Sequence, residues 1–165
     1  GGPRSAPARL ARWGDAQATS SEAATSSIED VAWSPTEASV LMTAGGGQDA
    51  SIAVCDCRRA GRRMLERPAA HEGADVNALA WNAAVSYLVA TAGDDGVVKV
   101  WDLRAFGGAT ATHVGRFDYH RGKPVAGLAW DPHDEAALAA AASGDDAVTL
   151  WDLSVEDDDD DDAAR

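Results

Sequence analysis

A short unit that ends in Trp-Asp, or in Cys-Asp in its first copy, occurs three times in this chain at nearly constant spacing. Its clearest copy runs from Ala90 to Arg104: an apolar stretch, a polar turn at Asp94–Gly96, and a valine-rich stretch that ends in Trp101 and Asp102. Aspartate followed by glycine suits a two-strand connection, because glycine adopts positive φ without strain. β-Branched and aromatic residues on both sides favour strand over helix. The unit is therefore predicted to be a β-hairpin.

Two further markers keep the same interval along the chain. The pairs Cys55-Asp56 and Trp151-Asp152 lie 46 residues before and 50 residues after Trp101-Asp102. Each hairpin also follows a short apolar segment that ends in tryptophan, and these tryptophans are Trp33, Trp81 and Trp130. A period in the forties that contains four short strands is the signature of WD40 propeller blades. The sequence thus predicts an all-β fold, a partial WD40 β-propeller with about three four-stranded blades of a larger, seven-bladed ring.

The same period divides the chain into five parts. Residues 1–27 are rich in Ala, Ser, Gly and Arg, and we expect a linker or insertion there that holds at most an outer strand of a preceding blade. Blades are predicted at 28–68, 75–119 and 120–155, the first degenerate because Cys55 replaces tryptophan and the third without its outer strand. Because the chain begins with two glycines and propellers close with roughly 4 to 8 blades, we expect the ring to be completed by sequence in a longer protein.

Negative charge is concentrated at the end of the chain. The net charge is −13, and seven adjacent carboxylates in the predicted disordered tail 156–165 carry more than half of it. These are Glu156, Asp157, Asp158, Asp159, Asp160, Asp161 and Asp162. Such a balance disfavours binding to a phosphate backbone and favours a basic protein partner. The run is interpreted either as a solubilising spacer or as a contact for that partner; it lacks the interleaved glycine and alternating ligands of a calcium loop.

The remaining residues do not predict a catalytic or cofactor site. Cys55 and Cys57 would point to the same face of one strand, which disfavours a disulfide between them and favours a reducing compartment. His113 and His133 have no Cys or His at metal-binding spacing. With neither a signal peptide nor an apolar run of membrane-spanning length, the sequence predicts an intracellular protein that is not an enzyme and binds no membrane, cofactor or metal.

In WD40 proteins, which these repeats resemble, a histidine, a hydroxyl, an aspartate and a tryptophan form a hydrogen-bonded tetrad that joins the loop before a blade to its third strand. The resemblance assigns these roles to His71, Thr91, Asp95 and Trp101. The third repeat keeps His120, Asp145 and Trp151 but has Ala141 at the hydroxyl position, so a partial tetrad is expected there. The same residue types could form a hydrolase triad, but the nucleophile would then face a packed interior.

Two segments fit the WDxR pattern found in receptors for a cullin-RING ubiquitin ligase adaptor. They contain Asp56 with Arg58 and Asp102 with Arg104, and Cys55 departs from the pattern in the first. In the simpler interpretation, each arginine ends its strand and pairs with a surface carboxylate, which contributes little energy.

The chain closely resembles the glutamate-rich WD-repeat proteins. The similarity rests on SIEDVAWSPTEA at 27–38, AHE at 70–72, DVN at 75–77, GDDGVVKVWDLR at 93–104 and WDLSVE at 151–156. It covers residues 26–156 and is weaker for the histone-binding subunits of chromatin complexes. The resemblance implies a protein of the nucleus and nucleolus with a role in ribosome assembly or histone binding.

Two functions are therefore expected as alternatives. The first is a scaffold that chaperones a basic client, either a large-subunit ribosomal protein or core histones. The second is a substrate receptor of a cullin-RING ubiquitin ligase, which would use Arg58 and Arg104 to hold the adaptor.

Overall fold

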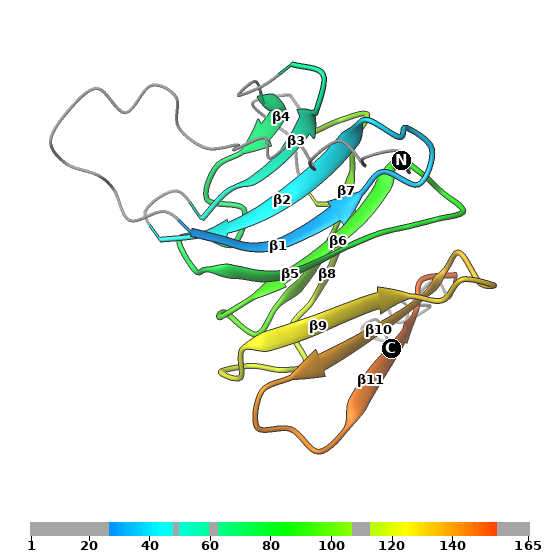
Figure 1. The fold of residues 1–165 in the computed structure, drawn as a ribbon. Coiled ribbons are helices and arrows are strands. Elements are labelled where there is room, and N and C mark those ends of the chain that lie inside the picture. The colour runs from blue at the N-terminus through cyan, green and yellow to red at the C-terminus, as the bar shows by residue number, and fades with distance from the viewer. Residues whose placement is uncertain (1–26, 48–49, 60–62, 107–112, 155–165) are drawn as a thin grey trace, which may run out of the picture.

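The computed structural model describes residues 27–47, 50–59, 63–106 and 113–154. Within these ranges the chain forms eleven strands and no helix. The strands make three antiparallel sheets that follow one another along the chain and stack face to face (Figure 1). The chain is therefore all-β, as predicted.

Each sheet is a meander in which neighbouring strands follow one another in sequence. The first contains β1 (Ser27–Trp33), β2 (Val40–Gly46), β3 (Ile52–Asp56) and β4 (Arg63–Arg67). The second contains β5 (Val76–Trp81), β6 (Leu88–Gly93), β7 (Val98–Asp102) and β8 (Gly115–Phe117). The third contains β9 (Val125–Trp130), β10 (Ala137–Ala142) and β11 (Val148–Asp152). Strand β8 is only three residues long. Residues 1–26 of the predicted linker 1–27 and the predicted acidic tail lie outside the described residues.

Two apolar layers hold the three sheets together. One lies between the first and second sheets and includes Met42, Ile52 and Val76; the other lies between the second and third and includes Val98 and Leu138. Strand β7 is buried along almost its whole length because it packs against a sheet on each side, whereas β11 alternates between exposed and half-buried residues.

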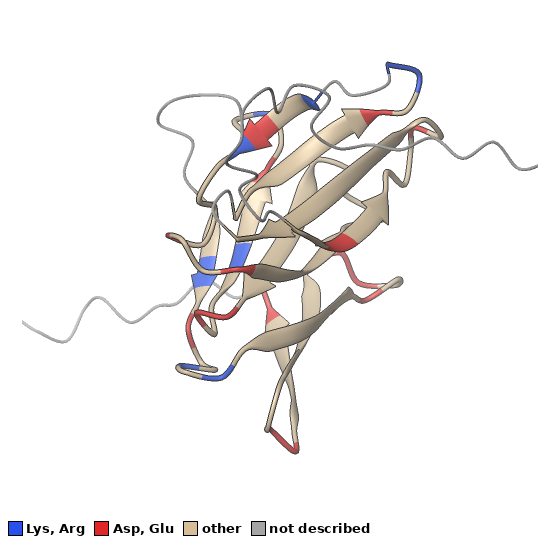
Figure 2. Cartoon of the chain, turned by 60° about the vertical axis from the view of Figure 1, so that its left-hand side comes forward, with Lys and Arg blue, Asp and Glu red and all other residues tan. Residues whose placement is uncertain are grey.

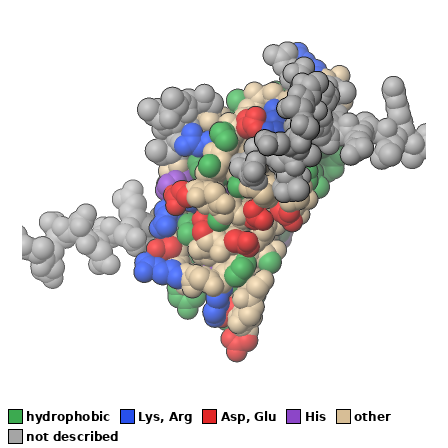
Figure 3. Space-filling view, turned by 90° about the vertical axis from the view of Figure 1, so that its left-hand side faces the viewer, with side chains coloured by type: hydrophobic (Ala, Val, Ile, Leu, Met, Phe, Trp, Pro, Cys, Tyr) green, Lys and Arg blue, Asp and Glu red, His purple; other side chains and the backbone are tan. Residues whose placement is uncertain are grey.

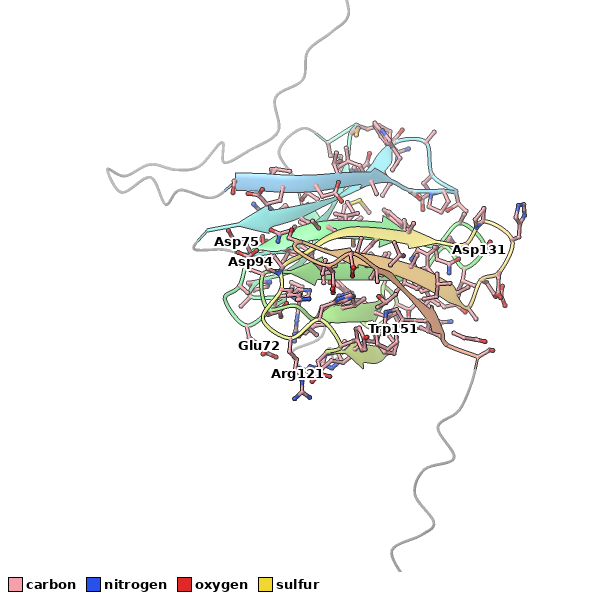
Figure 4. All side chains as sticks on the ribbon, turned by 90° about the horizontal axis from the view of Figure 1, so that it is seen from below. Glu72, Asp75, Asp94, Arg121, Asp131 and Trp151 are labelled. Carbon is pink, nitrogen blue, oxygen red and sulfur yellow. The ribbon has the colours of Figure 1, made fainter. Side chains whose placement is uncertain are left out.

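The meander places all loops on two opposite edges of the stack (Figure 4). We call one the histidine edge, formed by the start of β1 (27–29), the loops before β5 and β9 (69–75 and 118–124) and the hairpin turns 93–97 and 143–147. The other, the Trp-Asp edge, carries the ends of β1, β5 and β9 and the turns after β3, β7 and β11. In Figure 4 the labelled Asp75, Asp94 and Glu72 lie on the histidine edge, and Asp131 lies on the Trp-Asp edge.

Hydrogen bonds between sheets supplement the apolar layers. The Asp30 carboxylate accepts a bond of 2.9 Å from the Leu79 backbone N–H, which joins the innermost strands of the first two sheets. Asp75 accepts from the Gly47 N–H at 2.8 Å. Between the second and third sheets, the Trp130 indole donates to the Ala80 carbonyl at 3.0 Å. None of these contacts was predicted from the sequence, because each depends on how two sheets pack.

The described part of the chain contains no apolar helix of membrane-spanning length. Both cysteines are free thiols. Cys55, which stands where the other repeats have tryptophan, is buried, and burial raises the pKa of its thiol.

Candidate functional site

The four side chains assigned to the tetrad form one chain of hydrogen bonds in the second sheet. The His71 Nδ1 atom lies 2.9 Å from the Asp95 carboxylate, and His71 Nε2 lies 2.9 Å from Thr91 Oγ1. The Trp101 indole donates to the same Thr91 oxygen at 2.8 Å. An indole N–H can only donate, so the hydroxyl accepts from it and directs its own proton to Nε2; Nδ1 then carries the proton donated to Asp95. Every polar group in this network has a partner.

This network ties the loop before β5 to β6 and to the turn and strand that follow. His71 comes from the loop, Thr91 from β6, Asp95 from the turn and Trp101 from β7. Thr91 has no exposed surface. A buried hydroxyl in a closed network is not accessible to a substrate, so the geometry supports a structural role and not a hydrolase triad.

A buried lysine anchors the same loop at a second point. Lys99 on β7 is only 2% exposed, and its ammonium group donates to the Ala70 carbonyl at 2.9 Å and to the Glu72 carboxylate at 3.3 Å. Within the loop, Ala69 and Glu72 adopt left-handed backbone conformations, with φ of 49° and 56°. Residues other than glycine keep this conformation only when their surroundings hold them. The hydrogen bonds of Lys99 and His71 stabilise this conformation and therefore fix the loop 69–75 in place.

The Asp95 carboxylate has competing influences on its pKa. Burial raises it, but the hydrogen bond and charge of His71, together with the bond from the Val97 N–H, lower it further than burial raises it, so the net pKa is below its ordinary value. A carboxyl with a lowered pKa in the folded state contributes stability above its unfolded pKa and loses it as the pH falls through the folded pKa. This network should therefore weaken only in acid.

The third sheet has a network of different composition, which corrects the predicted position of the missing hydroxyl. Ala140, and not Ala141, is the equivalent of Thr91, because Ala140 pairs with Thr149 across the hairpin as Thr91 pairs with Lys99. Counting the interval of 50 residues from Trp101 to Trp151 places Ala141 at this position. Strand β10 instead keeps the interval of 49 residues that separates Trp81, at the end of β5, from Trp130, at the end of β9. The extra residue lies in the turn between β10 and β11.

Thr149 supplies the hydroxyl that β10 lacks. Its Oγ1 lies 2.8 Å from His120 Nε2, and His120 Nδ1 lies 3.3 Å from the Asp145 carboxylate. Lys123 also donates to Asp145, at 2.8 Å. Trp151, predicted to join the partial tetrad, does not take part: its indole nitrogen is buried without a hydrogen-bond partner in the described structure. The third sheet therefore keeps the histidine anchor but loses the tryptophan bond.

Replacing Thr149 with valine should lower the free energy of unfolding by about 1 kcal/mol, because the shape is kept while the hydroxyl that meets His120 is removed. The same change at Thr91 should cost about twice as much, since that hydroxyl is fully buried and serves the side chains of both His71 and Trp101, whereas Thr149 is half-buried and its second partner is the Ala140 carbonyl. Urea denaturation of the two variants checks the order. Equal losses would show that the two networks are equivalent.

The two WDxR segments form the same turn on the Trp-Asp edge. Two guanidinium nitrogens of Arg58 lie 2.9 Å from the two carboxylate oxygens of Asp56. Arg104 donates to both carboxylate oxygens of Asp102 in the same bidentate geometry. The arginine bonds hold the pKa of Asp56 at about 2. The Arg104 guanidinium also lies over the Tyr87 ring, 3.7 Å from its centre. The side chains of Arg58 and Arg104 remain 69% and 65% exposed. After β11 the same turn carries Ser154, bonded to Asp152.

Carboxylates gather on the histidine edge, where Figure 3 shows acidic side chains in the middle of the face. Glu29, Asp94 and Asp146 are exposed and Asp75 is half-buried. Within the described residues, none of these four forms an ion pair, and Asp75 and Asp94 bond to a backbone amide and to the Asn77 side chain. Figure 2 shows acidic residues on most turns of the stack, with basic residues fewer and scattered. The acidic run 156–162 lies outside the described residues.

Stacked antiparallel meanders, the second and third of which are linked to the preceding loop by a buried histidine, define the class of the protein as a β-propeller built from repeats. Residues 63–102 and 111–152 match the family described as WD40, the WD domain or G-beta repeat. The β-propeller domain of Cps50 (Swd1) from Myceliophthora thermophila superposes with a TM-score of 0.61, at 18% identity, over 78% of this chain and 36% of that one. The chain is a WD40-repeat protein and forms part of a WD40 β-propeller.

Curated relatives include proteins with different roles. The histone-binding protein MSI1 of Saccharomyces cerevisiae is 28% identical over 130 residues, which is 79% of this chain and 29% of that protein. The ribosome assembly protein rrb1 of Schizosaccharomyces pombe is 36% identical over 143 residues, 86% of this chain and 29% of rrb1. The DDB1- and CUL4-associated factor 11 homolog of Caenorhabditis briggsae is 36% identical over 66% of this chain and 19% of its own length. The chain thus spans less than a third of each of these relatives.

Proteins named protein transport protein Sec31 match the chain as well. None of the relatives described here is named as an enzyme. The comparisons therefore support an interaction scaffold of the WD40 class, and the choice of partner depends on the surface of the molecule.

Proposed function

We propose that this chain is part of a non-enzymatic scaffold that chaperones a basic protein client in the nucleus or nucleolus. The client is a large-subunit ribosomal protein or core histones. The observation that carries the proposal is a set of carboxylates on the histidine edge that form no ion pair with any residue the structure describes, namely Glu29, Asp75, Asp94 and Asp146. The relatives named for histone binding and ribosome assembly support the same class of client.

The proposed mechanism is attraction followed by neutralisation. A net charge of −13 draws a basic protein toward the chain and accelerates encounter at low salt. On contact, carboxylates on the edge and in the run 156–162 replace the solvent around lysine and arginine side chains of the client. Carboxylates already paired with lysine, such as Asp145 with Lys123, contribute less.

The rigid networks beneath this edge lower the cost of binding. His71 and Lys99 fix one loop, and His120 fixes the next, before any client arrives. Loops that are already ordered lose little conformational entropy on binding. The two histidine networks thus contribute to function by holding the acidic edge in place.

Neutralising three edge carboxylates should weaken client binding about tenfold, since the lost charge pairs contribute about 0.5 kcal/mol each. The variant is Glu29→Gln, Asp94→Asn, Asp146→Asn, and Kd for core histones is measured at about 50 and 300 mM salt. The matched control, Asp131→Asn, Asp134→Asn, Glu135→Gln, changes the net charge equally but lies on the Trp-Asp edge. If both variants weakened histone binding equally, the cause would be the net charge of the chain and not the carboxylates of the histidine edge.

A deletion of residues 156–162 separates the tail from the edge. We expect it to weaken histone binding and to reduce its dependence on salt. If the deletion changed neither the affinity for histones nor its salt dependence, the tail would be a solubilising spacer and not a contact for the client.

The alternative function is a substrate receptor of a cullin-RING ubiquitin ligase. It is favoured by one observation: Arg58 and Arg104 are exposed in the same bidentate geometry on one edge, and one relative is named as a DDB1- and CUL4-associated factor homolog. Asp56 and Asp102 would then act as supports that orient each guanidinium for the adaptor.

Replacing Arg104 with alanine should abolish capture of the adaptor, because an oriented guanidinium is a typical anchor of an interface. The measurement is recovery of purified adaptor on the immobilised chain. Arg121→Ala is the matched control, since Arg121 is also an exposed arginine paired with an aspartate, but on the histidine edge. Unchanged recovery with Arg104→Ala would remove this alternative.

A further inference from the structure

We propose that Ser154, in the turn after β11, is a phosphorylation site for a protein kinase that selects acidic substrates. The phosphoryl group comes from ATP. The serine oxygen forms the new bond to the γ-phosphorus, the bond from that phosphorus to ADP breaks, and the hydroxyl proton passes to a carboxylate of the kinase. The proposal concerns a side chain that neither the client surface nor the adaptor contact uses.

Ser154 is the residue at which its turn differs from the turns of the other two sheets. After β3 and β7 the same position holds Arg58 and Arg104, each paired with the aspartate two residues earlier. After β11 the Ser154 hydroxyl takes this role and donates to the Asp152 carboxylate at 2.6 Å. The Ser154 N–H donates to the same carboxylate oxygen at 2.9 Å. The third turn is therefore held by a hydroxyl, which is the group that a kinase modifies.

The Ser154 hydroxyl lies where an enzyme can reach it, because Ser154 is exposed on the Trp-Asp edge. The side chain of the equivalent Arg104 is 65% exposed even though its sheet packs against a neighbour on each side. Exposure at this position is thus a property of the Trp-Asp edge and not of the end of the stack. Only the bond from the hydroxyl to Asp152 has to open before transfer, and an exposed hydrogen bond contributes little to stability.

The sequence that follows Ser154 has the charge pattern that such a kinase selects. Seven of the next eight residues, 155–162, are Asp or Glu. No other serine in the chain is followed by more than two acidic residues over the same distance. Clustered carboxylates attract a substrate groove lined with lysine and arginine and accelerate the encounter. A hydroxyl at the start of this run therefore favours a kinase with a basic groove over one that selects basic substrates.

Ser143 shows what the acidic context of Ser154 adds. It is also exposed, and Asp145 and Asp146 follow it. It lies in the turn between β10 and β11, however, and Asp145 is already paired with Lys123 at 2.8 Å. A turn held in this way offers a kinase few free carboxylates, so Ser143 is a poor acceptor by comparison.

Phosphorylation of Ser154 changes the turn as well as the charge. The hydrogen bonds from the Ser154 hydroxyl and N–H lower the pKa of the Asp152 carboxyl, which is therefore ionised at neutral pH. A phosphate brings about −1.5 to −2 charges, so it repels this carboxylate where the hydroxyl bound it. The turn after β11 loses a bond, and the acidic run gains charge. Stronger binding of core histones is the expected consequence, and this consequence alone rests on the proposed function.

The test is incubation of the full chain with labelled ATP and a purified protein kinase that selects acidic substrates, followed by fragmentation mass spectrometry. We expect phosphate on Ser154, and Ser154→Ala should lower incorporation by about tenfold or more. The matched control is Ser143→Ala, which should leave incorporation unchanged. Both serines are exposed, so both variants keep the fold.

A second variant tests the role of the acidic run. Glu156→Gln, Asp157→Asn, Asp158→Asn keeps the hydroxyl and should lower kcat/KM of the kinase for the chain by about tenfold. Incorporation that survives Ser154→Ala, phosphate placed on Ser143 instead, or a kcat/KM that the neutralised run leaves unchanged would each overturn the proposal.

Histone binding separates this site from the proposed function. The phosphorylated chain should bind core histones about threefold more tightly than the unmodified chain at low salt. A chain that takes up phosphate on Ser154 but binds histones no more tightly would support the modification site and contradict its link to the client.

Discussion

Replacing His71 with alanine is expected to lower the free energy of unfolding by about 3 kcal/mol, the largest effect of any single polar residue in the described structure. The imidazole joins Asp95 to Thr91, and its removal leaves a half-buried carboxylate and a buried hydroxyl without their partner. It also releases the loop 69–75 from the network. Urea denaturation monitored by tryptophan fluorescence measures the loss.

His113→Ala is the matched control. His113 is half-buried and meets the edge of the Trp101 ring, with 5.8 Å between ring centres, but has no hydrogen bond within the described structure. Its removal should cost about 1 kcal/mol of packing. A loss at His71 no larger than the loss at His113 would contradict the role of the tetrad.

Replacing Gly96 with alanine should lower the free energy of unfolding by a similar amount, about 3 kcal/mol, because of the backbone conformation and close packing at this position. Gly96 has φ of +71°, and a Cβ atom there would lie 2.3 Å from the His120 carbonyl oxygen. The loop before β9 rests directly on this turn, so the change strains the turn and also separates the second sheet from the third. Thermal unfolding and denaturant titration both measure it.

Gly122 separates the two causes, because it has nearly the same φ, +74°, but no atom lies within 4 Å of the position that a Cβ atom would occupy there. Gly122→Ala should therefore lower the free energy of unfolding by only about 1 kcal/mol, the cost of placing alanine at positive φ. Equal losses at the two glycines would show that the close approach at Gly96 relaxes without cost.

Much of the fold follows from the sequence because its markers are local. The spacing of Trp33, Trp81 and Trp130 and of the Trp-Asp pairs reflects strand and turn lengths within one repeat, and strand pairing then leaves little choice of register. The tetrad of the second sheet was assigned from the resemblance to WD40 proteins, which places the histidine in the loop before a blade and the other three residues within the blade.

The position of the hydroxyl in the third sheet was wrong because a single inserted residue was assigned to the strand rather than to the turn. Alanine-rich β10 gives no signal for its own register, and only pairing with β11 shows that Ala140 faces Thr149. The contacts of Lys99 and Asp30 were not predicted from the sequence for a different reason. Charged side chains are ordinarily exposed, and the burial of Lys99 and the bond of the half-buried Asp30 to Leu79 both depend on a neighbouring loop or sheet that the local pattern does not contain.

Hydrogen exchange of the full chain, alone and with core histones, tests the proposed function most directly. We predict that the client slows exchange on the histidine edge, in residues 69–75, 93–97 and 143–147, and leaves the Trp-Asp edge at 34–39, 83–87 and 131–136 unchanged. Protection confined to the Trp-Asp edge, or no protection by a histone that binds, would contradict the assignment of the client surface.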